Sequence, residues 1–135
     1  MLKLIIGLKG TGKTKQLIEM VNASLLTSKG DVVCVEKGDK LRFDVKYQCR
    51  LIDSETFGIS GAPALYGFIA GILASNHDVT DLYVDSALKI CEDNKELFDE
   101  FIEKMAEYAE HSDVNFVMTS SLDENEASDI VKKYL

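Results

Sequence analysis

The chain has 135 residues, 46% of them hydrophobic and 28% charged, which is the size and composition of one globular domain with its own core. Its formal net charge of −8 argues against nonspecific nucleic-acid binding, because such binding needs cationic groups to meet phosphates. No apolar run approaches the roughly 20 residues of a membrane span. The first residues have neither the length nor the cleavage site of a signal peptide. We therefore expect one domain, residues 1–135, with neither a membrane nor a nucleic acid as partner.

Cysteine usage indicates a reducing compartment. The three cysteines, Cys34, Cys49 and Cys91, are widely separated, odd in number and without a Cys-x-x-Cys pair. This pattern matches neither a disulfide framework nor a zinc site, and free cysteine is commonly a small buried residue. We therefore expect three buried thiols in a cytoplasmic protein.

The first half of the chain alternates short apolar runs with a segment of helical period, a pattern typical of βαβ proteins. Residues 2–6 and 32–35 are predicted strands. Between them Leu17, Val21 and Leu25 recur at a spacing of four, which predicts an amphipathic helix. Lys29-Gly30 is expected to end that helix with a left-handed cap.

The segment that follows changes its period. Every second residue is apolar, in the series Leu41, Phe43, Val45, Tyr47, Cys49 and Leu51. A period of two predicts extended structure with one wet face, either a long edge strand or a hairpin. An exposed strand edge pairs readily, so the 41–52 edge is a predicted contact for a second copy or another protein. Both arginines, Arg42 and Arg50, fall here with Lys37, Lys40 and Lys46, and a solvated strand face explains this cluster most simply.

The second half predicts further alternation of helix and strand. A helix is expected to begin near Pro63, and Gly67 and Gly71 are expected to bring it close to the sheet. Further elements are a strand at 82–85, an amphipathic helix at 94–110 with Leu97 and Tyr108 facing inward, a strand at 114–118 and a last helix capped by Asp123. Right-handed crossovers then give an α/β fold, a three-layer sandwich with a mostly parallel sheet of four or five strands.

One motif carries specific chemistry. The segment Gly7-Leu8-Lys9-Gly10-Thr11-Gly12-Lys13-Thr14 matches G-x-x-x-x-G-K-[ST] at every fixed position. Its glycines allow the backbone to point consecutive N–H groups at an anion, and the helix that follows adds the positive end of its dipole. We expect a nucleoside triphosphate, ATP or GTP, to be bound by Gly7, Leu8, Lys9, Gly10, Thr11, Gly12, Lys13, Thr14 and Lys15. Lys13 is predicted to bridge the β- and γ-phosphates, and the Thr14 hydroxyl to bind Mg²⁺.

With this motif the sequence resembles the P-loop NTPases. The resemblance covers the whole chain at the level of the order of its strands and helices. Leu82-Tyr83-Val84-Asp85 is similar to their Walker B strand, which implies that Asp85 holds Mg²⁺ through water. A strand and helix between the two motifs are typical of the RecA-like, additional-strand branch. In that branch the strand after Walker B lies between the first and third strands and ends in a polar sensor residue. Thr119 or Ser120 matches that place, with a helix cap or loop hydroxyl as the alternative.

The sequence differs from the family pattern at the position of the catalytic glutamate. Members with vigorous hydrolysis carry a glutamate directly after the Walker B aspartate, where this chain has Ser86. Recombinase-like members carry it at the end of the second strand, a position that Glu36 occupies. The resemblance therefore implies Lys13 and Glu36 as catalytic residues. An ordinary exposed loop glutamate is the alternative for Glu36, and Arg42 or Arg50 is a candidate arginine finger toward a neighbouring subunit.

Three functions fit these features. The first is ATP binding with slow or partner-dependent, Mg²⁺-dependent hydrolysis; small proteins of this plan are distantly similar to twitching-motility ATPases, although no His or Asp boxes of a motor are recognisable. The second is a small-molecule or nucleoside kinase. The lid of such an enzyme normally supplies several arginines to the transferring phosphoryl group, and this chain has only two arginines. The third is a nucleotide-dependent switch or scaffold whose segment 36–60 orders when ATP binds.

Overall fold

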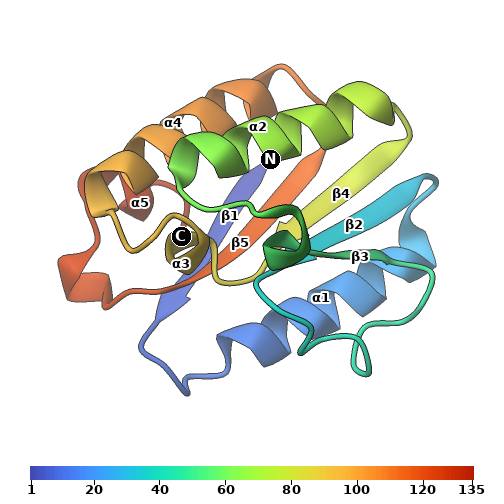
Figure 1. Ribbon diagram of the computed structural model, residues 1–135, viewed down its shortest axis with the longest axis horizontal. Coiled ribbons are helices and arrows are strands. Elements are labelled where there is room, and N and C mark those ends of the chain that lie inside the picture. Colours follow the sequence, from blue (N-terminus) through green and yellow to red (C-terminus); the bar gives the residue numbers. More distant parts are fainter.

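The computed structural model describes all 135 residues, and five parallel strands form its single sheet (Figure 1). The strands are β1 (Leu2–Gly7), β2 (Asp31–Glu36), β3 (Arg50–Asp53), β4 (Val79–Val84) and β5 (Asn115–Ser121). They lie in the order β1-β5-β4-β2-β3, and every neighbouring pair is parallel. The predicted α/β class and parallel sheet are confirmed, and β5 lies between β1 and β4 as expected. The carboxyl ends of all five strands therefore meet at one edge.

Helices cover both faces of this sheet (Figure 1). They are α1 (Lys13–Thr27), α2 (Ala62–Ser75), α3 (Ala87–Ile90), α4 (Lys95–Glu110) and α5 (Asp129–Lys132), with 3-10 turns η1 (Ser54–Phe57) and η2 (Glu124–Glu126). The chain moves one way across the sheet through α1 and returns through α2 and α4. Because crossovers are right-handed, opposite directions place α1 on one face and α2 with α4 on the other. No helix combines the length and apolar character that crossing a bilayer would need.

The core consists of two apolar clusters, one on each face of the sheet. The larger includes Leu65 of α2, Phe101 and Ile102 of α4, and the facing side chains of the strands. The smaller joins α1, through Leu17 and Val21, to the other side of the strands. The two clusters leave the carboxyl edge of the sheet to polar residues.

The segment between β2 and β3 corrects the predicted edge strand or hairpin. Residues 37–49 form a turn-rich loop, and β3 has only four residues. Burial in this loop recurs every fourth residue, not every second, because Leu41, Val45 and Cys49 pack against α1. Phe43 and Tyr47 are 86% and 90% exposed. The N–H groups of residues 44 and 45 both donate to the Leu41 carbonyl, a turn that a straight strand does not contain.

Other local predictions were wrong in informative ways. Gly67 and Gly71 are exposed, and an added Cβ at either would meet nothing within 4 Å, so neither brings α2 close to the sheet. Gly30 is not left-handed; an added Cβ there would lie 2.1 Å from the Asp78 carbonyl oxygen, so close approach requires glycine. Leu97 and Tyr108 are exposed on α4.

The last helix is also shorter than predicted. Asp123 caps the 3-10 turn η2, because its carboxylate accepts from the Asn125 N–H. Ser128 caps α5 by accepting from the Val131 N–H. Two capping residues, five positions apart, thus divide the predicted helix into two short turns.

Candidate functional site

The glycine-rich segment curls at the end of β1. Gly10 and Gly12 have φ angles of 85° and 86°, in the left-handed region that L side chains rarely adopt. At Gly7 an added Cβ would lie 2.6 Å from the Thr11 hydroxyl. Thr11 closes the curl, since its N–H and its hydroxyl donate to the Leu8 carbonyl at 3.3 and 2.7 Å. Each glycine of the motif therefore has a backbone or packing reason to be glycine.

The helix that follows begins without a side-chain cap. Gly12 occupies the N-cap of α1 and offers no side-chain acceptor, and the first turn holds no acidic residue. Asn94 of α4 and Ser128 of α5, in contrast, cap their helices with side-chain oxygens. The Lys13 ammonium donates to the Leu8 carbonyl at 2.9 Å, and Lys13 lines the cavity next to the loop. An anion above this loop would meet uncapped N–H groups, the positive end of the helix dipole and one ammonium group.

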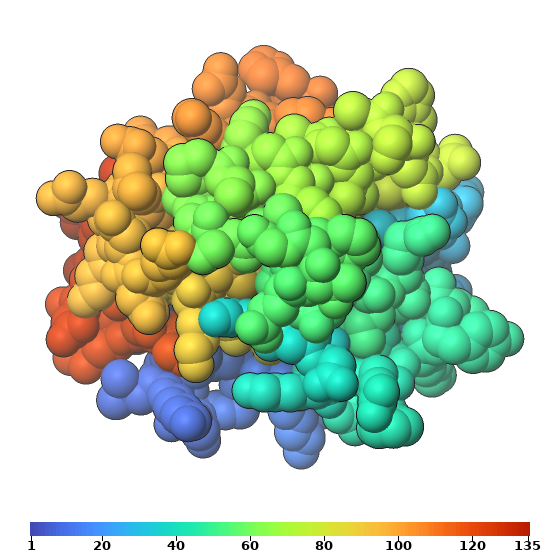
Figure 2. Space-filling model, in the orientation of Figure 1, coloured from blue at the N-terminus to red at the C-terminus, as the bar shows by residue number.

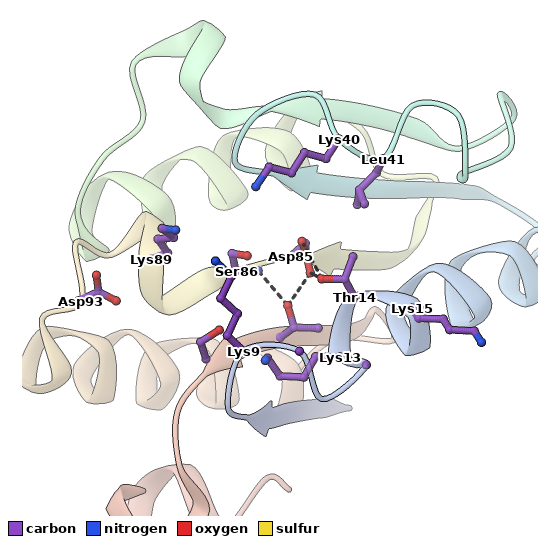
Figure 3. A pocket seen from close by; sticks show the side chains of 14 residues that line it. Lys9, Lys13, Thr14, Lys15, Lys40, Leu41, Asp85, Ser86, Lys89 and Asp93 are labelled. Atoms are coloured by element: carbon purple, nitrogen blue, oxygen red, sulfur yellow. Dashed lines mark hydrogen bonds between the residues drawn. The ribbon is translucent and has the colours of Figure 1, made fainter.

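This loop forms one wall of an open cavity of about 670 Å³ at the carboxyl edge of the sheet (Figure 3). Five lysines line it (Lys9, Lys13, Lys15, Lys40 and Lys89), against two aspartates (Asp85 and Asp93). Leu41 is its one hydrophobic residue. In a chain with a net charge of −8, this local excess of positive charge indicates a site for an anion. The cavity lies where the connections of neighbouring strands leave toward opposite faces, the place at which ligands bind in open α/β sheets.

Asp85 and the hydroxyls around it form the polar floor of the cavity. The Thr14 hydroxyl lies 3.2 Å from one Asp85 carboxylate oxygen and 3.4 Å from the other (Figure 3). The Thr119 hydroxyl donates to Asp85 at 2.7 Å and accepts from the Ser86 N–H at 2.9 Å. The predicted metal ligands Thr14 and Asp85 are thus brought together. Of the two predicted sensor residues, Thr119 lines the cavity, whereas Ser120 accepts from a backbone N–H at the start of α3.

The Thr14–Asp85 pair fits a magnesium ion. Hydroxyl and carboxylate oxygens are the hard ligands that Mg²⁺ prefers. The two side chains lie within hydrogen-bonding distance, at 3.2 Å, so Thr14 could hold an ion directly and Asp85 could hold it through water. No group of three or more His, Cys, Asp and Glu side chains gathers in the chain as a metal cluster. A cation here would therefore depend on further oxygens from water or a bound phosphate.

Glu36 lies at the end of β2, as predicted, but its carboxylate is engaged elsewhere. The side chain is 2% exposed and accepts from the N–H groups of Lys40 and Leu41, at 2.9 Å and at 3.3 to 3.4 Å. Burial raises the pKa of Glu36, and these two N–H donors oppose the shift. Glu36 does not line the cavity. Its contacts shape the loop that brings Lys40 to the cavity.

The structure adds cavity residues that the sequence did not suggest. Lys89 and Asp93 belong to α3 and the turn after it, directly beyond β4. Asp93 and the preceding Glu92 have φ angles of 56° and 60°, a left-handed pair in non-glycine residues. No motif marks these positions; their only sequence signal is that they follow the strand carrying Asp85. The arginines Arg42 and Arg50 are exposed and do not line the cavity.

The three cysteines are buried and unpaired, as predicted. Burial raises the pKa of Cys49 to about 11 and that of Cys91 to about 12, and it also raises that of Cys34. The thiols therefore stay protonated at neutral pH, which disfavours both metal binding and nucleophilic chemistry.

Neither the known protein-family models nor the curated proteins give a match to this chain. What the cavity binds is therefore inferred from its own residues.

Proposed function

We propose that this chain is a P-loop NTPase of the RecA-like type that binds a nucleoside triphosphate with Mg²⁺ in the lysine-lined cavity. The observation that carries the proposal is the convergence of three features on that cavity. They are the curled glycine loop before an uncapped helix, five lysines, and the Thr14–Asp85 pair. A volume of about 670 Å³ is within the range of small-molecule sites.

The residues of the chain then have distinct roles. The loop N–H groups and the helix dipole hold the β-phosphate, and Lys13 exchanges its contact with the Leu8 carbonyl for phosphate oxygens. Lys9 and Lys89 add positive charge at the walls. Mg²⁺, when bound to Thr14 and Asp85, would neutralise phosphate charge. The lining contains one hydrophobic residue, Leu41. The cavity would therefore recognise the phosphates of a nucleotide, and it offers little to distinguish adenine from guanine.

Hydrolysis by this chain alone is proposed to be slow. Ser86 stands where a water-polarising glutamate would follow Asp85, and its N–H is bonded to the Thr119 hydroxyl. Glu36 is occupied by the N–H groups of the 37–49 loop. Positioning and charge alone support turnover of about 10⁻³ s⁻¹ in P-loop GTPases that lack their activating partner. A partner protein would be needed for faster hydrolysis.

Calorimetry and a phosphate-release assay test this proposal. We expect ATP or GTP to bind with Mg²⁺ present, and Asp85→Asn to remove most of the difference in affinity between Mg²⁺ and EDTA. We expect phosphate release near 10⁻³ s⁻¹, unchanged by Glu36→Gln if Glu36 only shapes its loop. Fast release abolished by Glu36→Gln would instead make Glu36 the base. No affinity for either triphosphate would refute the proposal.

A small-molecule kinase is the second candidate, and one observation favours it. A second cavity of about 420 Å³ adjoins the first and shares Lys89 and Asp93 with it. Lys37, Glu55 and Ser60 also line it. A phosphoryl acceptor bound there would lie beside the proposed γ-phosphate, with Asp93 between the two cavities. Formation of ADP only when a metabolite panel is added would favour the kinase over the ATPase.

A further inference from the structure

The loop 37–49, here named the basic loop, presents two aromatic side chains on a fixed scaffold. Phe43 and Tyr47 are the most exposed large hydrophobic residues of the chain, at 86% and 90%. Their neighbours Leu41, Val45 and Cys49 are buried against α1. Figure 2 shows this teal segment projecting from the edge of the molecule. Exposed aromatic groups on a rigid support indicate a contact surface, because little conformational entropy is lost when they are covered.

Hydrogen bonds fix the same loop to the rest of the molecule. The Asn22 side chain of α1 donates to the Asp44 carbonyl at 3.0 Å and accepts from the Lys46 N–H at 3.1 Å. Glu36 holds the other end through the N–H groups of Lys40 and Leu41. The exposure of the two rings is therefore a property of the folded loop and not of a loose segment.

The charge of the basic loop is opposite to that of the whole chain. It holds Lys37, Lys40, Arg42 and Lys46 against two aspartates, and Arg50 follows directly. The Arg42 guanidinium lies 4.7 Å from the centre of the Phe43 ring. The remainder of the chain is correspondingly more acidic than the net charge of −8 suggests. A partner for this loop should offer negative charge around an apolar surface.

The outer surface of α4 has both properties. Five glutamates follow one stripe along the helix at spacings of three and four: Glu96, Glu100, Glu103, Glu107 and Glu110. Like charges at these spacings repel one another, and Lys104, four residues after Glu100 and three before Glu107, offsets only part of that repulsion. Beside the stripe, a shallow pocket between α2 and α4 is lined by Pro63, Tyr66, Leu97 and Phe101, with Glu100 and Lys104 at its rim. The Lys104 ammonium lies 5.4 Å from the centre of the Tyr66 ring, and the acidic residues outnumber it on this helix. Leu97 and Tyr108 are exposed on the same helix.

One chain cannot bring these two surfaces together. The basic loop packs in the apolar cluster on the α1 face of the sheet, whereas α2 and α4 pack in the cluster on the other face. Figure 2 likewise shows the teal loop and the orange helix α4 at opposite edges of the molecule. We propose that the basic loop of one copy docks on the α2–α4 surface of a second copy, with Phe43 and Tyr47 over the apolar pocket and the loop cations on the glutamate stripe.

This contact is head to tail. A two-fold contact through the loops would place the cations of one copy against those of the other, which is unfavourable. A head-to-tail contact leaves one loop and one α4 surface free, so it continues into a ring or a filament. It does not use strand pairing, and it does not depend on the proposed function. Lys40 and Leu41, near the start of the loop, also line the lysine-rich cavity, so docking would fix one wall of that cavity.

Light scattering after gel filtration tests the proposal with two variants, each of which has lost one of the two contact surfaces. The loop variant is Phe43→Ser with Tyr47→Ser, and the helix variant is Glu100→Gln with Glu103→Gln and Glu107→Gln. We expect wild type to exceed the monomer mass of 15.0 kDa as concentration rises, and to dissociate when salt rises from about 0.05 M to 0.5 M. Each variant alone should remain a monomer, with association weakened roughly tenfold or more.

Mixing the variants gives the decisive result. The intact loop of the helix variant and the intact α4 surface of the loop variant allow one contact, so the mixture should form a one-to-one dimer that grows no further. Leu26→Ser, which removes another exposed apolar side chain from α1, is the matched control and should associate like wild type. The changed residues are exposed, so melting curves should show all variants folded. A monomeric wild type, a mixture that stays monomeric, or a monomer that binds single-stranded oligonucleotide through Phe43 and Tyr47 would each overturn the proposal.

Discussion

At the scale of single residues, Glu36 shows how one carboxylate can shape a site without lining it. Its oxygens accept from the N–H groups of Lys40 and Leu41, and these contacts direct the start of the basic loop toward the cavity. The sequence predicted the position of Glu36, because the end of β2 is readily recognised. The sequence could not predict the N–H groups that Glu36 accepts from, since they belong to a loop whose path no local pattern indicates.

The raised pKa of Glu36 gives a prediction for the pH dependence of stability. Burial favours the protonated form, so the folded chain binds this proton more tightly than the unfolded chain. The associated stability is fully present below the ordinary pKa of 4.5 and is lost as pH rises through the folded pKa. Urea unfolding of wild type and Glu36→Gln between about pH 4 and pH 7 measures this. Wild type should lose stability relative to the variant as pH rises; a constant difference would contradict the account.

At the scale of elements, glycines of the loop and of α2 should respond oppositely to alanine. Gly12 has a φ of 86°, so Gly12→Ala should cost about 1–2 kcal/mol of stability or distort the loop. Gly67 is exposed within a helix and an added Cβ meets nothing within 4 Å, so Gly67→Ala should stabilise by about 0.5–1 kcal/mol. Urea unfolding of the two variants measures both changes. The account fails here if Gly12→Ala is neutral.

The segment 37–49 shows where a sequence pattern of period two can mislead. Six apolar residues alternate with polar ones, yet only Leu41, Val45 and Cys49 of the loop are buried. Phe43 and Tyr47 belong to the alternating apolar series, but their side chains are exposed to solvent. They therefore indicate a contact surface and not the buried face of a sheet. The pattern carries no information on which apolar residues the chain itself covers. The helix at 94–110 was predictable because its apolar stripe is broad and its N-cap, Asn94, is a strong signal.

At the scale of the whole molecule, the topology was predictable because helices and strands alternate and parallel crossovers have one hand. That placed the ends of β1, β4 and β5 together, and with them the glycine loop, Asp85 and Thr119. Lys89 and Asp93 reach the same cavity from a short helix and the turn after it, which have too few residues to show a period. The chemistry of the first three was visible in motifs, whereas the last two required the folded chain.

The central claim is that the curled loop and Lys13 hold a triphosphate, and one titration tests it most directly. Isothermal calorimetry with Mg-ATP and Mg-GTP would compare wild type, Lys13→Ala and Lys29→Ala. Lys29 is an exposed lysine that lines neither cavity, so its loss controls for the change in net charge. We predict that Lys13→Ala weakens binding by roughly tenfold to a hundredfold, the value of a charge-assisted contact, and that Lys29→Ala leaves it unchanged. Equal affinity in all three proteins, or no binding by wild type, would contradict the account.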